Sequence, residues 1–396
     1  KGKDGPMNKV GPDLILTYHE FKDYKARGGY AQLKHAFKPS HPLIRTSNDA
    51  VVIDIVAADE TDTLKSELLA LGMQEIEVFG RYISGLLPIG SLSAVASLTD
   101  LRLARPAYAM TMAGTVTSQG DTAQRSNNAR SSFNVDGTGV TVGTLSDSYN
   151  CKGGAAGDVS SDDLPPGVIV LQELSGCSSG IDEGRAMMQI IHDVAPGSNQ
   201  AFHSAFNGVA AFANGIIELA TLANADVIND DVIYYAEPMF QDGPIAQAAN
   251  SVKDMGVAYF SSAGNSAKQS YESNFRNSGQ SGYYSGSTRH DFDPGAGTDA
   301  LQDITISGGA TVTIVLQWDD PNYSVSGSPG ANTDIDLVLY RSSGNNPVAV
   351  SATNNIGGDA VELIQYKNTS GNDATYRIDI EHYTGPLPGI IKYVYY

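Results

Sequence analysis

The chain is poor in cysteine, tryptophan and basic residues. It has two cysteines and one tryptophan among 396 residues, and 25 Lys and Arg residues stand against 44 Asp and Glu residues. Because the sequence has no Cys-x-x-Cys pair, we do not expect a zinc site built from cysteines. The formal net charge of −19 disfavours nucleic acid and anionic membrane surfaces as partners. We attribute the acidity to solubility in a salty or extracellular setting.

The sequence also lacks an apolar run long enough to cross a bilayer, so we expect no membrane span. It shows no signal peptide, starts at Lys1 rather than Met, and finishes with an apolar stretch at 390–396. We therefore expect both ends to be cut. Abundant Asn, Ser and Thr with little Lys favours a secreted or cell-surface protein. Cys151 and Cys177 could form one disulfide, and two free thiols are an equally good interpretation.

The first two segments of the chain differ in their apolar patterns. Residues 1–48 have no clear apolar period, and we interpret them as a leader or linker. Residues 49–108 alternate extended and helical patterns, which predicts a small α+β domain with an open-faced sheet. Its predicted elements are a strand at 50–57, a helix at 61–71, an extended run at 75–87, a short helix at 91–98 and a strand at 101–108.

Residues 109–283 begin with a polar linker, 110–134, and continue as alternating strands and helices. This alternation with short connections predicts an α/β fold, in which helices cover both faces of a parallel sheet. Ligand sites in such sheets lie at the carboxyl ends of the strands. The predicted strands are 140–145, 168–174, 200–203, 226–229 and 257–262, and the predicted helices are 183–194, 208–222 and 243–255.

Residues 284–396 consist of short alternating runs separated by Gly, Asn, Thr and Ser, without a helix signal. This pattern predicts an all-β sandwich that resembles a jelly roll. Its aspartates could bind calcium, but their spacing matches no EF-hand loop, so we interpret them as surface carboxylates. These are Asp291, Asp293, Asp319, Asp320, Asp334 and Asp336. We assign no metal ligand and no cofactor, and calcium stays possible but unassigned.

Two carboxylates of the α/β segment stand where such a sheet carries its chemistry. Asp147 follows the strand at 140–145, where a carboxylate can orient a base, although Asp is also an ordinary turn residue. Glu183 starts the next predicted helix, one and two turns before Met187 and Ile190. Because these lie on the apolar face, Glu183 should point inward. A carboxylate that only stabilises the helix N-terminus is the alternative.

Polar residues also end the later strands. Asn265 follows the strand at 257–262, and its amide can donate to a developing oxyanion, unless it simply belongs to a tight turn. Asn229, Asp230 and Asp231 end or follow the preceding strand. We predict that these three residues bind substrate, and the two aspartates could instead cap a turn.

The order of these segments resembles that of subtilisin-like serine peptidases. In the subtilisin pattern a helix starts with His-Gly-Thr and ends with Val-Ala-Pro-Gly. Here residues 183–185 (Glu-Gly-Arg) start the helix and residues 194–197 (Val-Ala-Pro-Gly) end it. The resemblance places Glu183 at the position of the catalytic histidine. It makes Asp147 the orienting aspartate, with Ser146 as an alternative alignment.

The later segments resemble the same family. Ala263-Gly264-Asn265 resembles the oxyanion-hole segment, which implies that Asn265 is the donor, and residues 226–229 resemble one wall of the substrate groove. A glutamate in the histidine position is typical of sedolisins, the acid-active relatives of subtilisin. The chain departs from them at Met187, where they have a second acid, and at Asn265, where they have an aspartate. It is most similar to an uncharacterised bacterial sedolisin-like group.

The resemblance also gives roles to the flanking segments. Residues 49–108 resemble the propeptide that chaperones and inhibits these peptidases. Residues 284–396 resemble accessory sandwich domains, inserted before the nucleophile segment. That segment should read Gly-Thr-Ser-x-Ala, and the sequence has no match. We therefore expect a fragment of a secreted serine endopeptidase zymogen that acts on protein or peptide substrates. A pseudopeptidase that binds peptide or glycan at a cell surface is the alternative.

For the complete protein, the resemblance implies a Ser-Glu-Asp type of triad. Glu183 would be the base for the serine hydroxyl, and Asp147 would stand behind it and share a proton. Because a carboxylate stays ionised well below neutral pH, activity should extend into the acid range. His192 lies on another face of the same helix, so we interpret it as structural or exposed rather than as the base.

Overall fold

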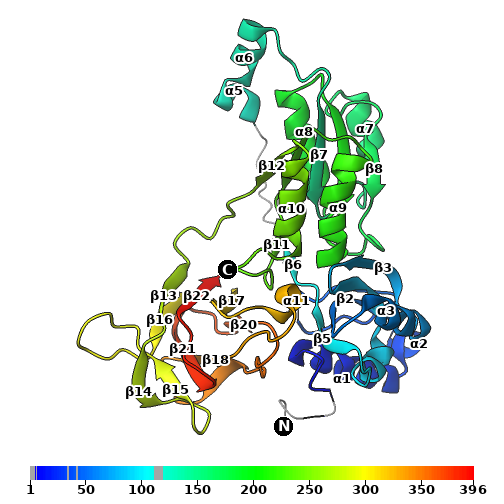
Figure 1. Cartoon of the computed structure of the whole chain (residues 1–396). Coiled ribbons are helices and arrows are strands. Elements are labelled where there is room, and N and C mark those ends of the chain that lie inside the picture. The colour runs from blue at the N-terminus through cyan, green and yellow to red at the C-terminus, as the bar shows by residue number, and fades with distance from the viewer. Residues whose placement is uncertain (1–4, 6, 34, 42, 111–118) are drawn as a thin grey trace.

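The structure is a computed structural model that describes residues 5, 7–33, 35–41, 43–110 and 119–396 (Figure 1). It contains an antiparallel N-terminal sheet, a central parallel sheet and a C-terminal sandwich of antiparallel sheets. Parts of two predicted segments lie outside the described residues: 1–4, 6, 34 and 42 in the leader, and 111–118 in the linker. No helix in the described part of the chain is long and apolar enough to span a membrane.

The first described elements are helix α1 (Pro12–Ala26) and the short helix α2 (Gly29–Leu33). They correct the interpretation of residues 1–48 as a leader or linker, because α1 packs into the core of the N-terminal sheet. Two of its four buried side chains carry hydroxyl groups, which weakens the apolar period in the sequence. The buried residues of α1 are Leu14, Thr17, Phe21 and Tyr24.

The N-terminal sheet has five antiparallel strands in the order β1-β2-β4-β3, with β5 paired to β2. The strands are β1 (Thr46–Ser47), β2 (Ala50–Ala57), β3 (Gln74–Phe79), β4 (Tyr82–Pro88) and β5 (Leu101–Pro106). The helical elements are α3 (Thr61–Ala70), the 3₁₀ turn η1 (Ile89–Ser91) and α4 (Leu92–Val95). The predicted extended run at 75–87 is a hairpin of β3 and β4.

Strand β2 explains why this sheet has two buried faces. Side chains alternate between the faces of a strand, so Ile53 and Ile55 share one face and Val52 and Val56 the other. The first pair packs in a core with residues of α1 and α3. The second pair packs in a core with residues of the central α/β region, including Phe212. The N-terminal sheet is therefore docked on the rest of the chain through its open face.

The central sheet has five parallel strands in the order β12-β10-β7-β9-β8, which confirms the predicted parallel sheet. The strands are β7 (Thr141–Ser146), β8 (Ile169–Gln172), β9 (Asn199–Ser204), β10 (Val227–Asp230) and β12 (Ala258–Ser261). The helices of this region are α5 (Gly120–Gln124), α6 (Ser126–Phe133), α7 (Ala155–Ser160), α8 (Glu183–Val194), α9 (Val209–Thr221) and α10 (Pro244–Asp254).

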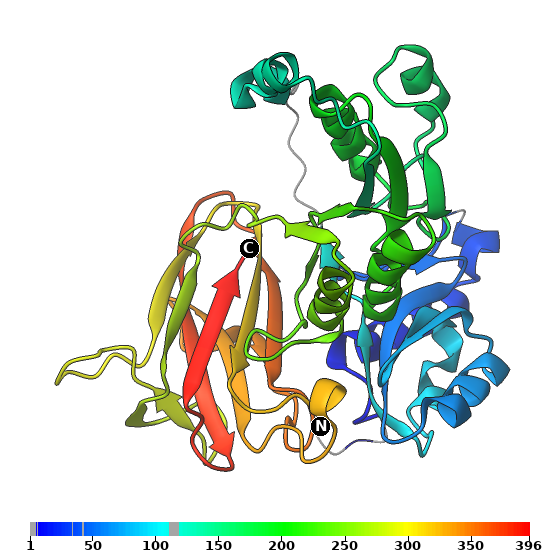
Figure 2. The same ribbon diagram turned by 45° about the horizontal axis from the view of Figure 1, so that its top comes forward.

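Helices α8 and α9 contact side chains that alternate along β9. Gly184 of α8 lies against Phe202, and Gly215 of α9 lies against the neighbouring His203. The two helices therefore flank opposite faces of the sheet (Figures 1 and 2). In the strand order, β9 and β8 lie on one side of β7, and β10 and β12 lie on its other side. After β7 the chain therefore continues to one side of the sheet, and after β10 it continues to the other side. The carboxyl ends of β7 and β10 thus form a switch point, the usual place for a ligand site.

Helix α8 packs through a face that the sequence did not indicate. Gly184 and His192 are buried, whereas Met187 is half-buried and Ile190 is 38% exposed. The cause is the close approach at Gly184, where an added Cβ would overlap the ring of Phe202. The prediction that Met187 and Ile190 mark the inward face is therefore wrong. His192 is a buried structural residue, in agreement with one of the two interpretations given above.

The C-terminal sandwich consists of a four-stranded sheet, β13-β22-β17-β20, and a six-stranded sheet, β14-β15-β21-β18-β19 with β16 paired to β21. Its largest fully buried side chain is Trp318. The strands are β13 (Ser270–Asn274), β14 (Asn277–Ser281), β15 (Thr288–His290), β16 (Gln302–Ile306), β17 (Thr311–Trp318), β18 (Asp334–Arg341), β19 (Pro347–Ser351), β20 (Val361–Lys367), β21 (Ala374–Thr384) and β22 (Ile390–Tyr395).

The sandwich begins earlier than the predicted boundary at residue 284. Strand β13 pairs with β22 and strand β14 with β15, so residues 270–281 belong to the sandwich rather than to the α/β region. These strands are rich in Ser, Asn and Gly, and the sequence pattern therefore did not reveal them. One helical turn, α11 (Tyr323–Ser326), also interrupts the expected all-β pattern.

Arginines of the N-terminal sheet bind loops of the sandwich. Arg105 Nη1 lies 2.9 Å from Asp359 Oδ2 in a mostly buried ion pair. The Arg102 guanidinium lies 4.8 Å from the centre of the Tyr323 ring. The Tyr323 hydroxyl donates to the carbonyl of Ala58 at 2.5 Å. The N-terminal sheet therefore contacts both other parts of the chain.

The aspartates interpreted as surface carboxylates have two kinds of surroundings. Asp334 and Asp336 are buried on β18, so that interpretation is wrong for them, because the strand lies between β21 and β19 inside the sandwich. Asp320 instead organises a loop by accepting the N–H groups of Asn332 and Thr333 at 2.9 and 2.7 Å. In the part of the chain that the structure describes, no group of three or more acidic, His or Cys side chains is arranged to hold a metal ion.

Candidate active site

The start of α8 faces the carboxyl ends of β7 and β10, where several carboxylates meet. Asp147 directly follows β7, Asp230 ends β10 and Asp231 follows it. Glu183 is the first residue of α8. This edge of the parallel sheet therefore brings together four of the residues selected from the sequence.

Asp147 binds the main chain at the start of α8 rather than the side chain of Glu183. It is 1% exposed, and its Oδ1 accepts the N–H of Glu183 at 2.9 Å. Its Oδ2 accepts the N–H of Ile181 at 2.5 Å and the hydroxyl of Ser148 at 2.9 Å. A carboxylate at this position satisfies N–H groups that the first turn of a helix leaves free. Asp147 thus fixes the backbone of Glu183.

The carboxyl group next to that of Glu183 is Asp231. Burial, and then the charge of Glu183, raise the pKa of Asp231 to about 7, while the hydroxyl of Ser146 acts in the opposite direction. Glu183 thus acts on the pKa of Asp231, whereas Asp147 bonds to the main chain of Glu183. The sequence had marked Asp231 only as a substrate-binding residue.

The same region holds buried polar atoms that lack a hydrogen-bond partner within the described part of the chain. Such atoms are rare in folded proteins and call for an explanation. Here they gather on the α8 side of β7 and β10. They are Ser146 Oγ, Glu183 Oε2, Asn229 Oδ1 and Asp231 Oδ1.

Asn229 and Asp230 point to opposite faces of β10. Asn229 is half-buried on the face of Thr144, its partner in register on β7, and so lies beside the candidate site. Asp230 accepts the hydroxyl groups of Tyr259 at 2.7 Å and Ser261 at 3.0 Å on the other face. Asp230 is 5% exposed, and its burial raises its pKa. Asn229 therefore lies on the α8 side of the sheet, where its amide contacts Thr144, and Asp230 bonds to β12 on the other side.

Asn265 lies in an exposed bend after β12. No hydrogen bond joins its side chain to Asp147 or Glu183 in the described residues. Next to β10, strand β12 is the outermost strand of the described sheet, and Phe260 on it is 62% exposed. Phe260 is in register with Asn229 and shares its face, so the α8 side of the sheet is open beside the site.

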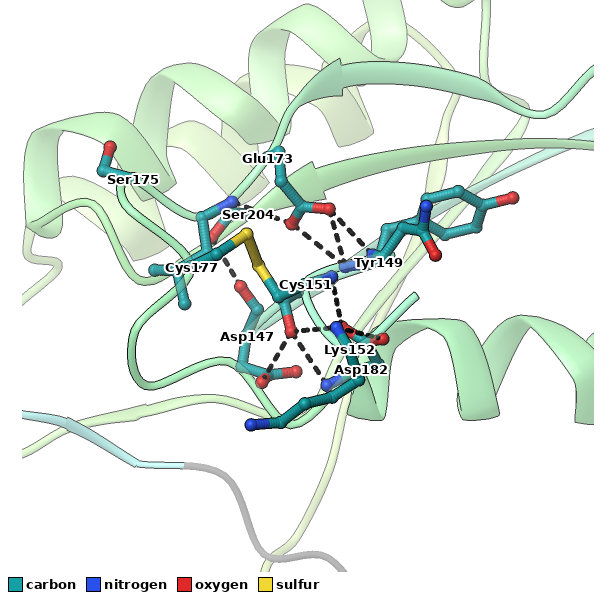
Figure 3. The surroundings of a disulfide bond; sticks show 12 residues. Asp147, Tyr149, Cys151, Lys152, Glu173, Ser175, Cys177, Asp182 and Ser204 are labelled. Atoms are coloured by element: carbon teal, nitrogen blue, oxygen red, sulfur yellow. Dashed lines mark hydrogen bonds between the residues drawn. A yellow bond between two sulfur atoms is a disulfide. The ribbon is translucent and has the colours of Figure 1, made fainter. Parts of the chain in front are cut away.

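Two further acids, which the sequence pattern did not single out, shape the loop after β7 (Figure 3). Asp182 accepts the N–H groups of Cys151 at 2.7 Å and Lys152 at 2.9 Å. Glu173 accepts those of Tyr149 at 3.0 Å and Asn150 at 2.8 Å. A signal for Asp182 was present, since it stands directly before the helix that Glu183 begins.

A disulfide joins Cys151 to Cys177 in this loop (Figure 3), which decides between the two alternatives left open by the sequence. The cysteines are 26 residues apart. Replacing both by Ala is expected to lower the free energy of unfolding by about 3 kcal/mol, because the open loop gains entropy in the unfolded chain. Urea unfolding with and without reductant measures this. Reductant should destabilise the original chain and leave the double variant unchanged; equal stability of both would contradict the prediction.

The N-terminal sheet reaches the same half of the molecule. Its chain leaves through β6 (Ala109–Met110), which pairs with β11 (Ile233–Tyr234), two residues after Asp231. Asp54 of β2 is 1% exposed and accepts the N–H of Val209 at 3.0 Å. Ser84 of β4 accepts the N–H of Ala210 at 3.1 Å. Two side chains of the N-terminal sheet thus cap the first turn of α9.

Loss of this cap should have a measurable cost. Asp54→Ala is expected to lower the free energy of unfolding by about 2 kcal/mol, because it leaves a buried N–H of α9 without an acceptor. Asp54→Asn is the matched control, since its amide oxygen can still accept the Val209 N–H. Urea unfolding of both variants provides the measurement. The assignment fails if the Ala variant is as stable as the Asn variant.

Comparison with known proteins gives weak structural likenesses. No family model and no curated protein matches the chain. Fervidolysin from Fervidobacterium pennivorans, a keratinolytic enzyme related to subtilisin, is 15% identical with a TM-score of 0.32, over 85% of this chain and 53% of that one. The chain thus spans about half the length of fervidolysin. The pre-peptidase C-terminal domain of collagenase from Bacillus anthracis is 11% identical with a TM-score of 0.18, over 24% of this chain and 74% of that one.

Proposed function

We propose that this chain is part of a secreted serine endopeptidase of the subtilisin and sedolisin type. The observation that carries the proposal is the arrangement at the start of α8. Asp147 holds the backbone of Glu183, and the Glu183 carboxyl group stands beside Asp231 at the switch point of the sheet. An acidic group held in this way at a helix start is suited to act as a general base.

In the proposed reaction a serine from outside these 396 residues attacks the peptide carbonyl. Glu183 takes the proton of the serine hydroxyl as the oxygen attacks, and later returns it to the leaving amine. Asp147 is a positioning residue, because it contacts the main chain of Glu183. Asn229 is proposed to bind substrate from the open face of β10. Asn265 is proposed as the oxyanion donor, which requires that its exposed bend moves toward the site when the serine segment is in place.

Exposed apolar side chains beside the site support the proposal that a further segment of the complete protein covers this surface. Phe260 on β12 is 62% exposed and Ile190 on α8 is 38% exposed. Phe260, in register with Asn229, lies on the α8 side of the sheet, where the unpartnered oxygen of Glu183 also lies. A segment that carries the nucleophilic serine would cover apolar side chains that water now contacts, which is favourable at roughly 25 cal/mol per Å².

We further propose that the N-terminal sheet acts as an intramolecular inhibitor, in a zymogen. It caps α9 through Asp54 and Ser84, and its exit strand β6 leads the chain past β11 beside Asp231. An inhibitor that is covalently attached and docked in this way is present at high effective concentration. The Cys151–Cys177 disulfide supports a location outside the cytosol, because disulfides persist in oxidising compartments.

Fluorophosphonate labelling of the protein made from the complete gene tests the proposal. The probe reacts with activated serines, so we expect one labelled serine in a Gly-Thr-Ser segment that follows Tyr396, and no labelling of the 396-residue chain. Labelling should disappear in heat-denatured protein. A complete gene that encodes no such segment, or an encoded serine that stays unlabelled after removal of the N-terminal sheet, would overturn the proposal in favour of a binding protein.

A further inference from the structure

Asp231 is placed beside Glu183 by the end of β10. Side chains alternate along a strand, so Asp231 follows Asn229 onto the α8 side of the sheet, while Asp230 points to the other side. On β7, Ser146 is the next residue on this side after Thr144, the partner of Asn229. Glu183 and Ser146 both act on the Asp231 carboxyl group, and all three side chains have a buried oxygen without a partner in the described residues, so the three groups lie together here.

We propose that Glu183 and Asp231 form one acid pair that holds a single proton between them, with Asp231 as the positioning residue. Each carboxyl group has one buried oxygen without a hydrogen-bond partner in the described residues, Oε2 of Glu183 and Oδ1 of Asp231. Two neighbouring acceptors cannot satisfy each other while both groups are ionised. One added proton converts one of them into a donor and satisfies both oxygens.

The other charged groups nearby cannot take this role. Asp147 already accepts two N–H groups and a hydroxyl group, all of which require acceptor oxygens. Asp230 accepts two hydroxyl groups on the opposite face of the sheet. Asp182 is bound to main-chain N–H groups and to Arg185 at 2.9 Å. Asp231 is thus the acid that remains for Glu183.

The role of the acid pair in catalysis rests on the proposed function, but the existence of the pair does not depend on that function. With the proton on Asp231, the hydrogen bond points from Asp231 to Glu183, and Glu183 stays a carboxylate that can accept a proton from a serine. The Ser146 hydroxyl is fully buried, so we assign it to the orientation of Asp231 and not to attack on a substrate. Since two close acids titrate as a unit, each should respond to removal of the other.

Carbon-13 NMR of the 396-residue chain, labelled at the Asp and Glu carboxyl carbons, tests the pair. Asp231→Asn and Glu183→Gln identify the two signals, which are followed between about pH 4 and pH 9. Glu183→Gln is expected to lower the titration midpoint of Asp231 by about one pH unit or more, a tenfold change in proton affinity. Ser146→Ala is expected to raise that midpoint, because the hydroxyl group favours the ionised form of Asp231.

Glu218→Gln is the matched control, since Glu218 lies on α9 at the other face of the sheet and pairs with His203. It should leave the Asp231 midpoint unchanged. An Asp231 midpoint that does not respond to Glu183→Gln would overturn the acid pair, even if the complete protein labels with fluorophosphonate. If the titration midpoints of Asp231 and Glu183 are coupled but the complete protein does not react with fluorophosphonate, the acid pair is supported and only the proposed peptidase function is contradicted. If Asp231→Asn does not fold, the signal that moves in both Glu183→Gln and Ser146→Ala identifies Asp231.

Discussion

Under the proposed function, Glu183→Gln in the complete protein is expected to reduce the rate of peptide hydrolysis by about 10³-fold, the typical contribution of a general base. A glutamine side chain keeps the volume and the polar atoms of glutamate but cannot accept the serine proton. The N–H of residue 183 still binds Asp147, so the start of α8 should keep its conformation. The loss should therefore appear in kcat, with KM little changed.

The pH–rate profile separates this role from a structural one. The original protein should remain active well below neutral pH, because the proposed base is a carboxylate. Glu218→Gln, on α9, should retain both the rate and the profile. A single optimum above neutrality with no acid activity, or a Glu183→Gln variant with near-original kcat, would remove Glu183 from the mechanism.

At about pH 8, Asp231→Asn is expected to raise the free energy of unfolding by about 2 to 4 kcal/mol, and near pH 4 to leave it unchanged. Burial and the charge of Glu183 raise the pKa of Asp231 to about 7 in the folded chain, whereas an unfolded Asp has a pKa of about 3.9. Between these values the unfolded chain releases the proton and the folded chain keeps it. The free energy of unfolding therefore falls as the pH rises between these two pKa values. Above the higher value, the whole loss of stability remains. An asparagine, always neutral, avoids that cost.

Urea unfolding at both pH values measures the effect. Asp226→Asn is the matched control, because Asp226 stands exposed just before β10 and binds the N–H of Thr141. Because this carboxyl group is exposed, its substitution should not stabilise the chain at pH 8. A stability gain of Asp231→Asn that does not depend on pH would show that the side chain is not an unfavourably buried acid.

The α/β fold was readable from the sequence because its elements carry strong patterns. Helix α8 was predicted at its observed bounds, and the five strands of the parallel sheet were predicted with small shifts. Helix α1 was missed because its buried face includes Thr17 and Tyr24, and β13 was missed because an edge strand of Ser and Asn has no apolar alternation. Local patterns report burial of apolar side chains, and these elements bury few of them.

The sequence predicted where the site residues lie along the chain, but not which of their side chains contact one another. The sequence placed Asp147 at the end of β7 and Glu183 at the start of α8, and both are there. It could not show that Asp147 would bind main-chain N–H groups, because that depends on how the loop of Asp182 folds back on it. Nor could it show that Asp231 lies next to Glu183, because that contact depends on the register of β10 on β7.

The N-terminal sheet is, in effect, a bivalent ligand of the rest of the chain. One of its surfaces binds α9 through Asp54, and its arginines bind the sandwich, with Arg105 on Asp359. When one contact opens, the other keeps the partners at a high effective concentration, which raises the overall affinity by about 10² to 10⁴ over either contact alone. A single cut in the connecting chain would therefore leave the sheet bound. The N-terminal sheet dissociates only when its contacts with α9 and with the sandwich are both open at the same time. Its dissociation should therefore be slow until one of the two contact surfaces is unfolded or cleaved.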